Sequence, residues 1–417
     1  MNDALRQYRL GSNFSVSFPD FPGFTETPKT FRLIQEVGKQ DIVHIKYPYQ
    51  SPFYLKALKT GVPVLITWKT DASKDKFYGY VYDVSPVTER GFNREVLIKC
   101  IGATLGAKET DNKIWINKTA SQIVEEIAKK LKLKPSVTPS KIVFSQQSMV
   151  NHTYWDKIQE LARRIGYVAQ AYGTELNFHP IDVMIDKSMT AVPIMQFVDA
   201  ESPRFSELYE HTLDEFKPTV GDLTVSSMFG KRDKVVSSID PYTSKTRSYT
   251  SSPSTWKKLR SSNKDPLFKE SLSTTTVASH AMARAMADAQ SKLSRYSIFA
   301  EGKAQGDARI APYRTIEVRG TGEFTDGYWV VTKVEHFLTW AGKYEVEFSC
   351  MTDGVGKNNK TASRPEVAED KPIRDVDFEL KSKVYSKPVT TTLSSTAAMI
   401  NQTSGGFKVT PRRWGGR

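Results

Sequence analysis

Hydrophobic and polar residues alternate along most of the first quarter of the chain, in short runs separated by Pro and Gly. Period-2 alternation at this spacing is typical of strands in an antiparallel sandwich or barrel. One run has helical spacing instead, from Ser51 to Lys59 after Pro48. The alternating runs predict strands over residues 31–37, 41–47, 62–68, 77–84 and 95–102.

The pattern becomes helical between Lys118 and Phe178. Thr119 and Gln122 have the spacing of a capping box, and apolar residues then recur on one helical face until Pro135. These residues predict one amphipathic helix with a defined start and stop.

A second helix follows the same rules. Thr153 is its expected N-cap, Asp156 lies three residues on, and Gly166 is expected to end it in the left-handed conformation. Residues 167–178 then have the pattern of a hairpin with its turn at Gly173. The two helices and this hairpin predict a small α+β module.

Strand-like runs return after residue 180. Residues 181–225 are of this kind, with 193–198 the clearest strand and 205–216 compatible with either a strand or a helix. A Ser/Thr-rich polar stretch at about 223–270 follows and is expected to be a loop-like insertion.

The last part of the folded chain combines a helix with a meander. A long helix rich in Ala and Met is predicted from Thr275 to Tyr296. Three alternating runs separated by turn residues then predict a β-meander over 315–319, 328–337 and 344–350. From Val355 to Arg417 there is almost no apolar periodicity, so this tail alone is expected to be disordered or extended.

The charge is concentrated in the two polar segments. The 417 residues carry 59 basic and 46 acidic side chains, a formal net charge of +13. Residues 223–270 hold 10 basic and 4 acidic residues, and residues 355–417 hold 12 and 6, so the remaining chain is almost neutral. A neutral body weakens the interpretation as a nucleic-acid-binding groove, and the basic segments are expected to be solvated or to contact an acidic partner.

No catalytic motif stands out. The six histidines, at 44, 152, 179, 211, 280 and 336, lack metal-ligand spacing, and no phosphate-binding loop or nucleophile elbow occurs. Cys100 and Cys350 lie within strand patterns and are expected to be core residues. Glu207 and Glu210 could form a glycosidase carboxylate pair, but nothing distinguishes them from solvated acids. The sequence therefore predicts no enzyme, metal site or cofactor.

The order of these modules resembles the central hub of phage and phage-like tail baseplates, the late control protein D family, and the hub part of type VI secretion spike proteins. Three stretches carry the resemblance: residues 118–133, residues 154–178, and the helix and meander between Ala278 and Phe348. Together they cover about residues 30–354.

The resemblance implies a mainly β fold with an α+β insert, built from two tail-tube-like antiparallel β-barrels plus a small helix/hairpin module. The implied domains are a first barrel at 1–106, the α+β module at 107–180, a second barrel at 181–354 with the basic insertion at about 223–270, and an extended basic tail at 355–417.

The implied function is that of a structural hub without enzymatic activity. Three chains would form a ring that adapts a sixfold tail tube to a threefold spike, in a tail baseplate assembled in the host cytoplasm. The implied partners are the tail tube protein or distal tube ring and the spike or tip protein, with the tape measure and baseplate wedge proteins as further candidates.

Two alternatives stay open: a hub that also hydrolyses the cell wall, and a nucleic-acid-binding tail component. Candidate partner-binding residues come from the two basic segments, and none is assigned to catalysis, metal or cofactor binding. They are Lys231, Arg232, Lys257, Lys258, Arg260, Arg412, Arg413 and Trp414.

Overall fold

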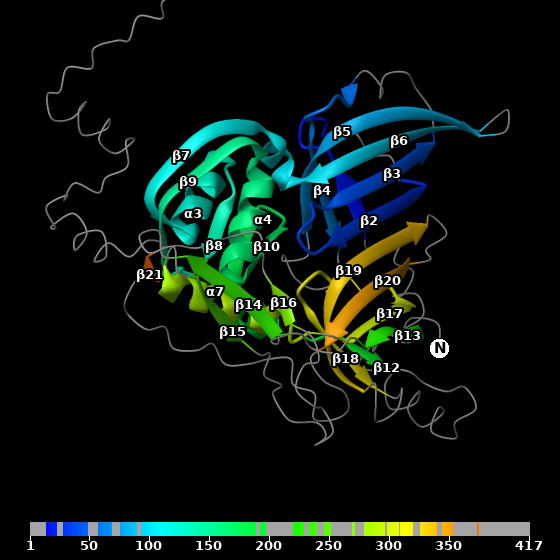
Figure 1. Cartoon of the computed structure of the whole chain (residues 1–417). Coiled ribbons are helices and arrows are strands. Elements are labelled where there is room, and N and C mark those ends of the chain that lie inside the picture. The colour runs from blue at the N-terminus through cyan, green and yellow to red at the C-terminus, as the bar shows by residue number, and fades with distance from the viewer. Residues whose placement is uncertain are drawn as a thin grey trace, which may run out of the picture. The chain divides into compact units, whose positions relative to one another are not determined.

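Strands dominate the computed structural model, in which the described residues form one large sheet and three small ones (Figure 1). The predicted class, mainly β with an α+β insert, is confirmed. The residues that the structure describes are 14–22, 28–48, 57–68, 76–89, 93–188, 192–196, 220–228, 233–239, 246–251, 269–271, 279–296, 298–307, 309–319, 326–339, 344–352 and 373–374.

The N-terminal part of the chain supplies six antiparallel strands to a 12-stranded sheet, in the order β1-β4-β5-β6-β3-β2. All five predicted strands are present, and β1 is an addition. Most of the helix predicted at Ser51–Lys59 lies outside the described residues. The strands are β1 (Phe14–Ser17), β2 (Thr30–Glu36), β3 (Ile42–Pro48), β4 (Pro63–Trp68), β5 (Lys76–Glu89) and β6 (Asn93–Gly102).

The C-terminal part of the chain continues the same sheet. The predicted meander is confirmed as β18 (Thr315–Arg319), β19 (Gly327–Thr339) and β20 (Tyr344–Thr352). Beyond β20 the sheet continues with β17 (Ile298–Gln305) and β13 (Val220–Met228), while β12 (Ile194–Gln196) pairs in parallel with β18.

Strand β19 joins the two parts. Its first residues pair with β18, from Gly327 to Val330, and its last seven pair with β2, from Lys333 to Thr339. On its other edge it pairs with β20. One hydrophobic core therefore contains side chains from both parts of the chain, among them Phe31, Leu33, Val43, Ile98, Cys100, Val331, Val346 and Cys350.

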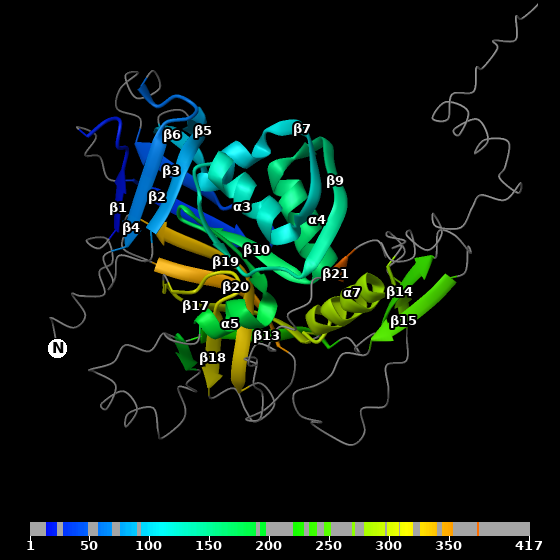
Figure 2. The same cartoon turned by 90° about the vertical axis from the view of Figure 1, so that its left-hand side faces the viewer.

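The α+β module lies between these parts in sequence. Figure 2 shows its helices α3 and α4 beside the long strands β7 and β9. These two antiparallel strands were not predicted. The elements are the 3-10 helix η2 (Ala103–Lys108), β7 (Thr110–Thr119), α3 (Ala120–Lys130), β8 (Lys134–Val137), β9 (Ile142–Thr153), α4 (Tyr154–Ile165), β10 (Tyr167–Tyr172) and β11 (Glu175–Pro180).

Both predicted capping boxes are confirmed. The Thr119 hydroxyl accepts a hydrogen bond from the Gln122 backbone N–H at 3.2 Å, and the Gln122 side chain accepts one from Thr119 N–H at 3.0 Å. Thr153 and Asp156 make the same pair of contacts at the start of α4. Gly166 ends α4 with φ = 72°, as predicted. These helix ends are defined by residues within one turn of each other.

Two predictions of secondary structure were wrong. A strand-like run was expected from residue 181, but α5 (Ile181–Ser188) is a helix, because Ile181, Met184 and Ile185 are buried at helical spacing. Part of the expected loop at 223–270 forms strands, namely β13 and a three-stranded sheet of β14 (Asp233–Ile239), β15 (Thr246–Ser251) and β16 (Lys269–Ser271).

The small sheet packs against a helix. Val236 of β14 is buried in the same core as Met282 and Met286 of α7 (His280–Leu293), which covers most of the predicted helix. In the C-terminal tail, β21 (Ile373–Arg374) pairs in parallel with Ile142 and Val143 of β9. The other residues of the tail lie outside the described part.

The end of α4 is in close contact with α7. A Cβ atom placed on Gly166 would lie 2.3 Å from the Cβ of Ala289 and 2.9 Å from its backbone. Gln290 also donates a hydrogen bond to the carbonyl of Arg163. Glycine at 166 thus satisfies both the backbone conformation and the packing.

Gly166→Ala is expected to destabilise the fold by about 2 to 4 kcal/mol, because the new methyl group adds a steric overlap to the strain of a left-handed backbone. Urea denaturation measures the change. Gly61→Ala is the control, since Gly61 also has a positive φ but, among the described residues other than its two chain neighbours, no atom lies within 4 Å of its Cβ position, so mainly the strain remains. Equal losses in the two variants would contradict the packing argument.

Candidate functional site

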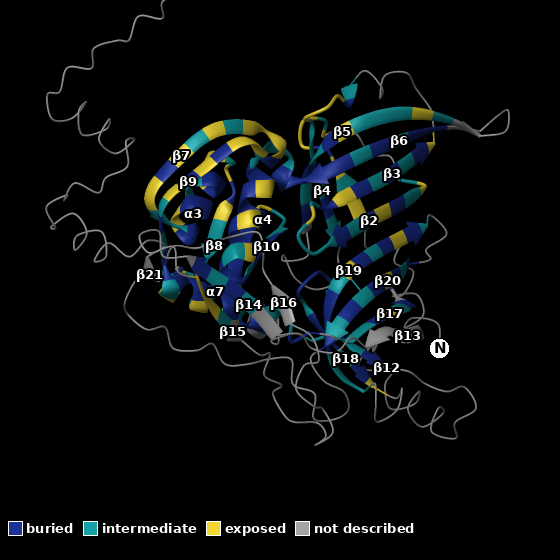
Figure 3. Cartoon of the chain, viewed as in Figure 1, coloured by how far each residue is buried: buried dark blue, intermediate teal, exposed yellow. Residues whose placement is uncertain are grey.

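Charged side chains form a row across one face of the large sheet. Along β2 and β3, buried residues alternate with more exposed ones (Figure 3). Strand register places the charged residues of these and the neighbouring strands opposite or diagonal to each other. From β17 to β5, the row contains the charged residues Lys303, Glu347, Glu335, Arg32, Lys99 and Asp83, with the imidazole of His44 between Arg32 and Lys99.

The central pair of this row joins the two parts of the sheet. Arg32 on β2 donates to Glu335 on β19 with Nε and Nη2, at 2.5 and 2.9 Å. The bidentate hydrogen bond with Glu335 raises the pKa of Arg32 above its ordinary value. A paired guanidinium and carboxylate thus cross the only strand pairing that connects the two parts within the described residues.

Ion pairs also form on either side of the centre. Lys303 on β17 contacts Glu347 at 3.0 Å, and Lys99 on β6 contacts Asp83 at 3.2 Å. The pKa of His44 is lowered by burial and by the positive charges of Arg32 and Lys99, so its imidazole is neutral at pH 7. Since the row carries both signs, the face lacks the uniform positive charge that a phosphate backbone requires.

A hollow of about 440 Å³ lies at the β17 end of this face. Gly302 has no side chain and Ser349 a small one, while acidic and basic side chains surround them. The hollow offers polar contacts of both signs to a partner. Its lining residues are Glu301, Gly302, Lys303, Lys333, Glu335, Glu347, Phe348 and Ser349.

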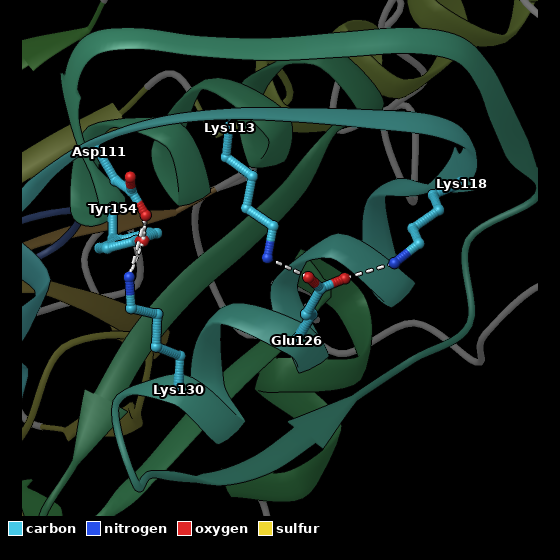
Figure 4. A network of polar contacts seen from close by, with 6 residues as sticks. All are labelled: Asp111, Lys113, Lys118, Glu126, Lys130 and Tyr154. Atoms are coloured by element: carbon cyan, nitrogen blue, oxygen red, sulfur yellow. Dashed lines mark hydrogen bonds and ion pairs between the residues drawn. The ribbon is translucent and has the colours of Figure 1, made fainter.

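A second polar network lies on the α+β module (Figure 4). Glu126 of α3 accepts hydrogen bonds from Lys113 and Lys118 of β7, which lower its pKa to about 2. The carboxylate thus ties the helix to two points along the strand.

Next to it, Lys130 at the end of α3 lies 3.0 Å from Asp111 of β7. The Tyr154 hydroxyl donates to Asp111 and accepts from Lys130. The hydrogen bond from Tyr154, followed by the one from Lys130, lowers the pKa of Asp111 to about 2. Every polar group of this network has a partner, so its geometry explains helix attachment and gives no indication of catalysis.

The eight predicted partner-binding residues all lie outside the described residues, as do Glu207 and Glu210. Within the described ranges, no group of three or more His, Cys, Asp or Glu side chains could hold a metal ion. Cys100 and Cys350 are buried core residues, as predicted. Both ring nitrogens of buried His336 have hydrogen-bond partners, the Tyr344 hydroxyl at 2.9 Å and the Ile310 carbonyl at 3.1 Å, so its role is explained by hydrogen bonding within the core.

The charged row was missed at the sequence level. Its residues occupy the polar positions of the alternating runs, for example Arg32 between Phe31 and Leu33. That pattern identifies a polar face on each strand, but it does not indicate which strands are neighbours.

No helix among the residues described has the length and apolar character needed to cross a membrane.

The fold has clear counterparts among phage tail and type VI secretion proteins of known structure. A 43 kDa tail protein of prophage MuSo2 from Shewanella oneidensis aligns with a TM-score of 0.55 and 11% identity, over 81% of this chain and 97% of that one. A tail protein from Neisseria meningitidis MC58 aligns with a TM-score of 0.56 and 10% identity, over 82% and 97%.

A third counterpart is the E. coli c3393 protein, a component of the type VI secretion system with structural similarity to the T4 tail proteins gp27 and gp5. It aligns with a TM-score of 0.50 and 10% identity, over 85% of this chain and 81% of that one. No protein-family model matches the sequence, and no curated protein matches it. The chain thus has the fold of these tail and type VI secretion proteins, and the resemblance predicted from the sequence is confirmed at the level of the fold.

The Arg32–Glu335 pair is expected to show a coupling of about 0.5 to 1 kcal/mol in a double-mutant cycle with alanine, because the pair is bidentate but partly solvated. Chemical denaturation of the four proteins measures it. The coupling should shrink in about 1 M salt, where the Debye length is about 3 Å. The matched control is the same double-mutant cycle on Lys99 and Asp83. This ion pair lies on the same face but within one part of the sheet. No coupling at low salt would contradict the assignment.

Proposed function

We propose that this chain is a structural baseplate hub of a phage or phage-like tail. In this role three copies form a ring that adapts a sixfold tail tube to a threefold spike or tip. The similarity of fold to the Shewanella and Neisseria tail proteins and to the E. coli type VI secretion component is the observation that carries the proposal.

The open ends of the large sheet support ring formation. Within the described residues, β1 pairs only with β4 at one end, and β13 pairs only with β17 at the other. Unpaired strand edges favour association with another chain, and a closed ring of identical subunits leaves no free edge. Three copies with two β-rich parts each would present six similar units around the axis.

The domain organisation belongs to the same proposal. Residues 1–106 and 181–354 form the two tube-like parts, residues 107–180 form the α+β module, and 355–417 form the tail. The mixed charge of the exposed face is compatible with a protein partner, which we take to be the tail tube protein and the spike. The candidate residues of the two basic segments would contact further baseplate proteins. They are Lys231, Arg232, Lys257, Lys258, Arg260, Arg412, Arg413 and Trp414.

The full-length chain is expected to be a trimer. Native mass spectrometry at micromolar concentration should give three times the chain mass of 47.0 kDa, and negative-stain electron microscopy should show rings with threefold symmetry. A monodisperse monomer in solution that is also present as single copies in the tail would overturn the proposal.

Removal of residues 376–417 separates ring formation from partner binding. This truncation keeps β21 and its pairing with β9, and contacts within the chain place Met1–Asp375 in one unit. The expected result is an intact trimer that enters tails at least tenfold less efficiently, measured by quantitative mass spectrometry of assembled particles. Substitution of Arg412 and Arg413 by Gln is the milder companion variant. Normal incorporation after truncation would mean that residues 376–417 have no part in assembly.

A further inference from the structure

The loop between β2 and β3 connects the large sheet to the α+β module. The indole N–H of Trp155 on α4 donates to the carbonyl of Gly38 at 3.0 Å. The Gln40 side chain donates to the carbonyl of Thr104 in η2 at 2.7 Å. A Cβ on Gly38 would lie 3.2 Å from the Gln159 side chain. The loop is therefore closely packed against the module.

Asp41 lies at the centre of this joint. Its carboxyl group accepts a hydrogen bond from Gln35 of β2 at 2.7 Å and one from Gln170 of β10 at 3.4 Å. Its backbone carbonyl accepts from the N–H of Gly102 at 2.9 Å. One residue thus links β2, β6 and the module, and only 8% of its surface is exposed.

The surroundings of Asp41 are polar, and within the described residues no cation pairs with its carboxyl group. Lys39 is largely exposed and pairs with Glu36 at 2.8 Å. The Tyr172 hydroxyl donates to the Pro312 carbonyl, and the guanidinium of Arg314 lies over the Tyr172 ring at 5.6 Å.

Besides Asp41, the charged residue that lines the small cavity beside it, among the described residues, is Lys39. Its volume is about 10 Å³, and Tyr78 of β5, Trp155 of α4 and Gln170 of β10 help to line it. A buried carboxylate with amide donors but no cation is costly to ionise. Burial therefore raises the pKa of Asp41 to about 7, against the opposing hydrogen bond from Gln35.

We propose that Asp41 is a pH-sensitive latch between the large sheet and the α+β module. The protonated carboxyl group keeps the joint closed, and its ionisation weakens the joint. This inference depends on the buried carboxyl group and its contacts, and it would hold for a monomer or a ring alike.

The direction of the effect follows from the two protonation equilibria. The folded joint binds the proton more tightly than the unfolded chain, in which the pKa is close to 3.8. The contribution of Asp41 to stability is therefore greatest below about pH 4 and is lost as the pH rises to about 7. A difference of about three pKa units corresponds to a factor of about a thousand in the equilibrium constant for unfolding of the joint.

Hydrogen exchange of the full-length protein tests the latch. Backbone exchange is measured by mass spectrometry at pH 5.5 and 8.5 and corrected for the intrinsic chemical rate, in peptides that cover 37–41, 102–104 and 168–172. The wild type should exchange at least tenfold faster at the higher pH in these peptides. Asp41→Asn, which cannot ionise, should show the same corrected rate at both pH values.

Asp83→Asn is the matched control. Asp83 lies on the exposed face of β5, and its pKa is lowered by hydrogen bonds from Ser85 and Lys99, so its loss should leave the pH response intact. A wild type without pH response, or an Asp41→Asn variant that keeps it, would overturn the latch. Should Asp41→Asn fail to fold, infrared titration of the wild-type carboxyl groups decides: a buried group titrating near pH 7 supports the proposal, and its absence refutes it.

Discussion

The shared edge of β19 is the constraint on which the rest of the structure depends. This strand of 13 residues pairs with β18 along its first part and with β2 along its last part, while β20 occupies its other edge. Because β19 extends past β18, its free hydrogen-bonding groups are available to a strand from the other end of the chain. The two β-rich parts therefore share one sheet and one core, and the charged face runs without interruption from β17 to β5.

Local features of this fold could be predicted from the sequence, since residues close in the chain determine them. The capping boxes at Thr119 and Thr153, the stop at Gly166 and the final meander are of this kind. The pairing of β2 with β19 is different, because almost 300 residues separate the two strands and many alternating runs have compatible patterns. Strand β7, the partner of β9, was missed for a different reason. It buries little besides Trp115, so it lacks a strong apolar period.

The candidate site was only partly accessible to sequence reasoning. Net charge directed attention to the basic segments, because a charge excess is visible in composition. Ion pairs cancel in such a count, so a face on which Arg32 meets Glu335 and Lys99 meets Asp83 contributes almost nothing to it. The near-neutral body predicted from composition and the charged row on the sheet are therefore two views of the same residues.

Strand β2 takes part in both connections of the molecule. Its outer side chain Arg32 pairs with Glu335 of the neighbouring strand β19, and its inner side chain Gln35 donates to Asp41 beside the module. A slip of β2 by one residue could not relieve strain in the following loop, since it would turn Phe31 and Leu33 to solvent and Arg32 into the core. With β2 held by β19 on one edge and β3 on the other, the polar contacts of residues 38–41 add to the apolar cluster of Val168 and Val330 in attaching the module to the sheet.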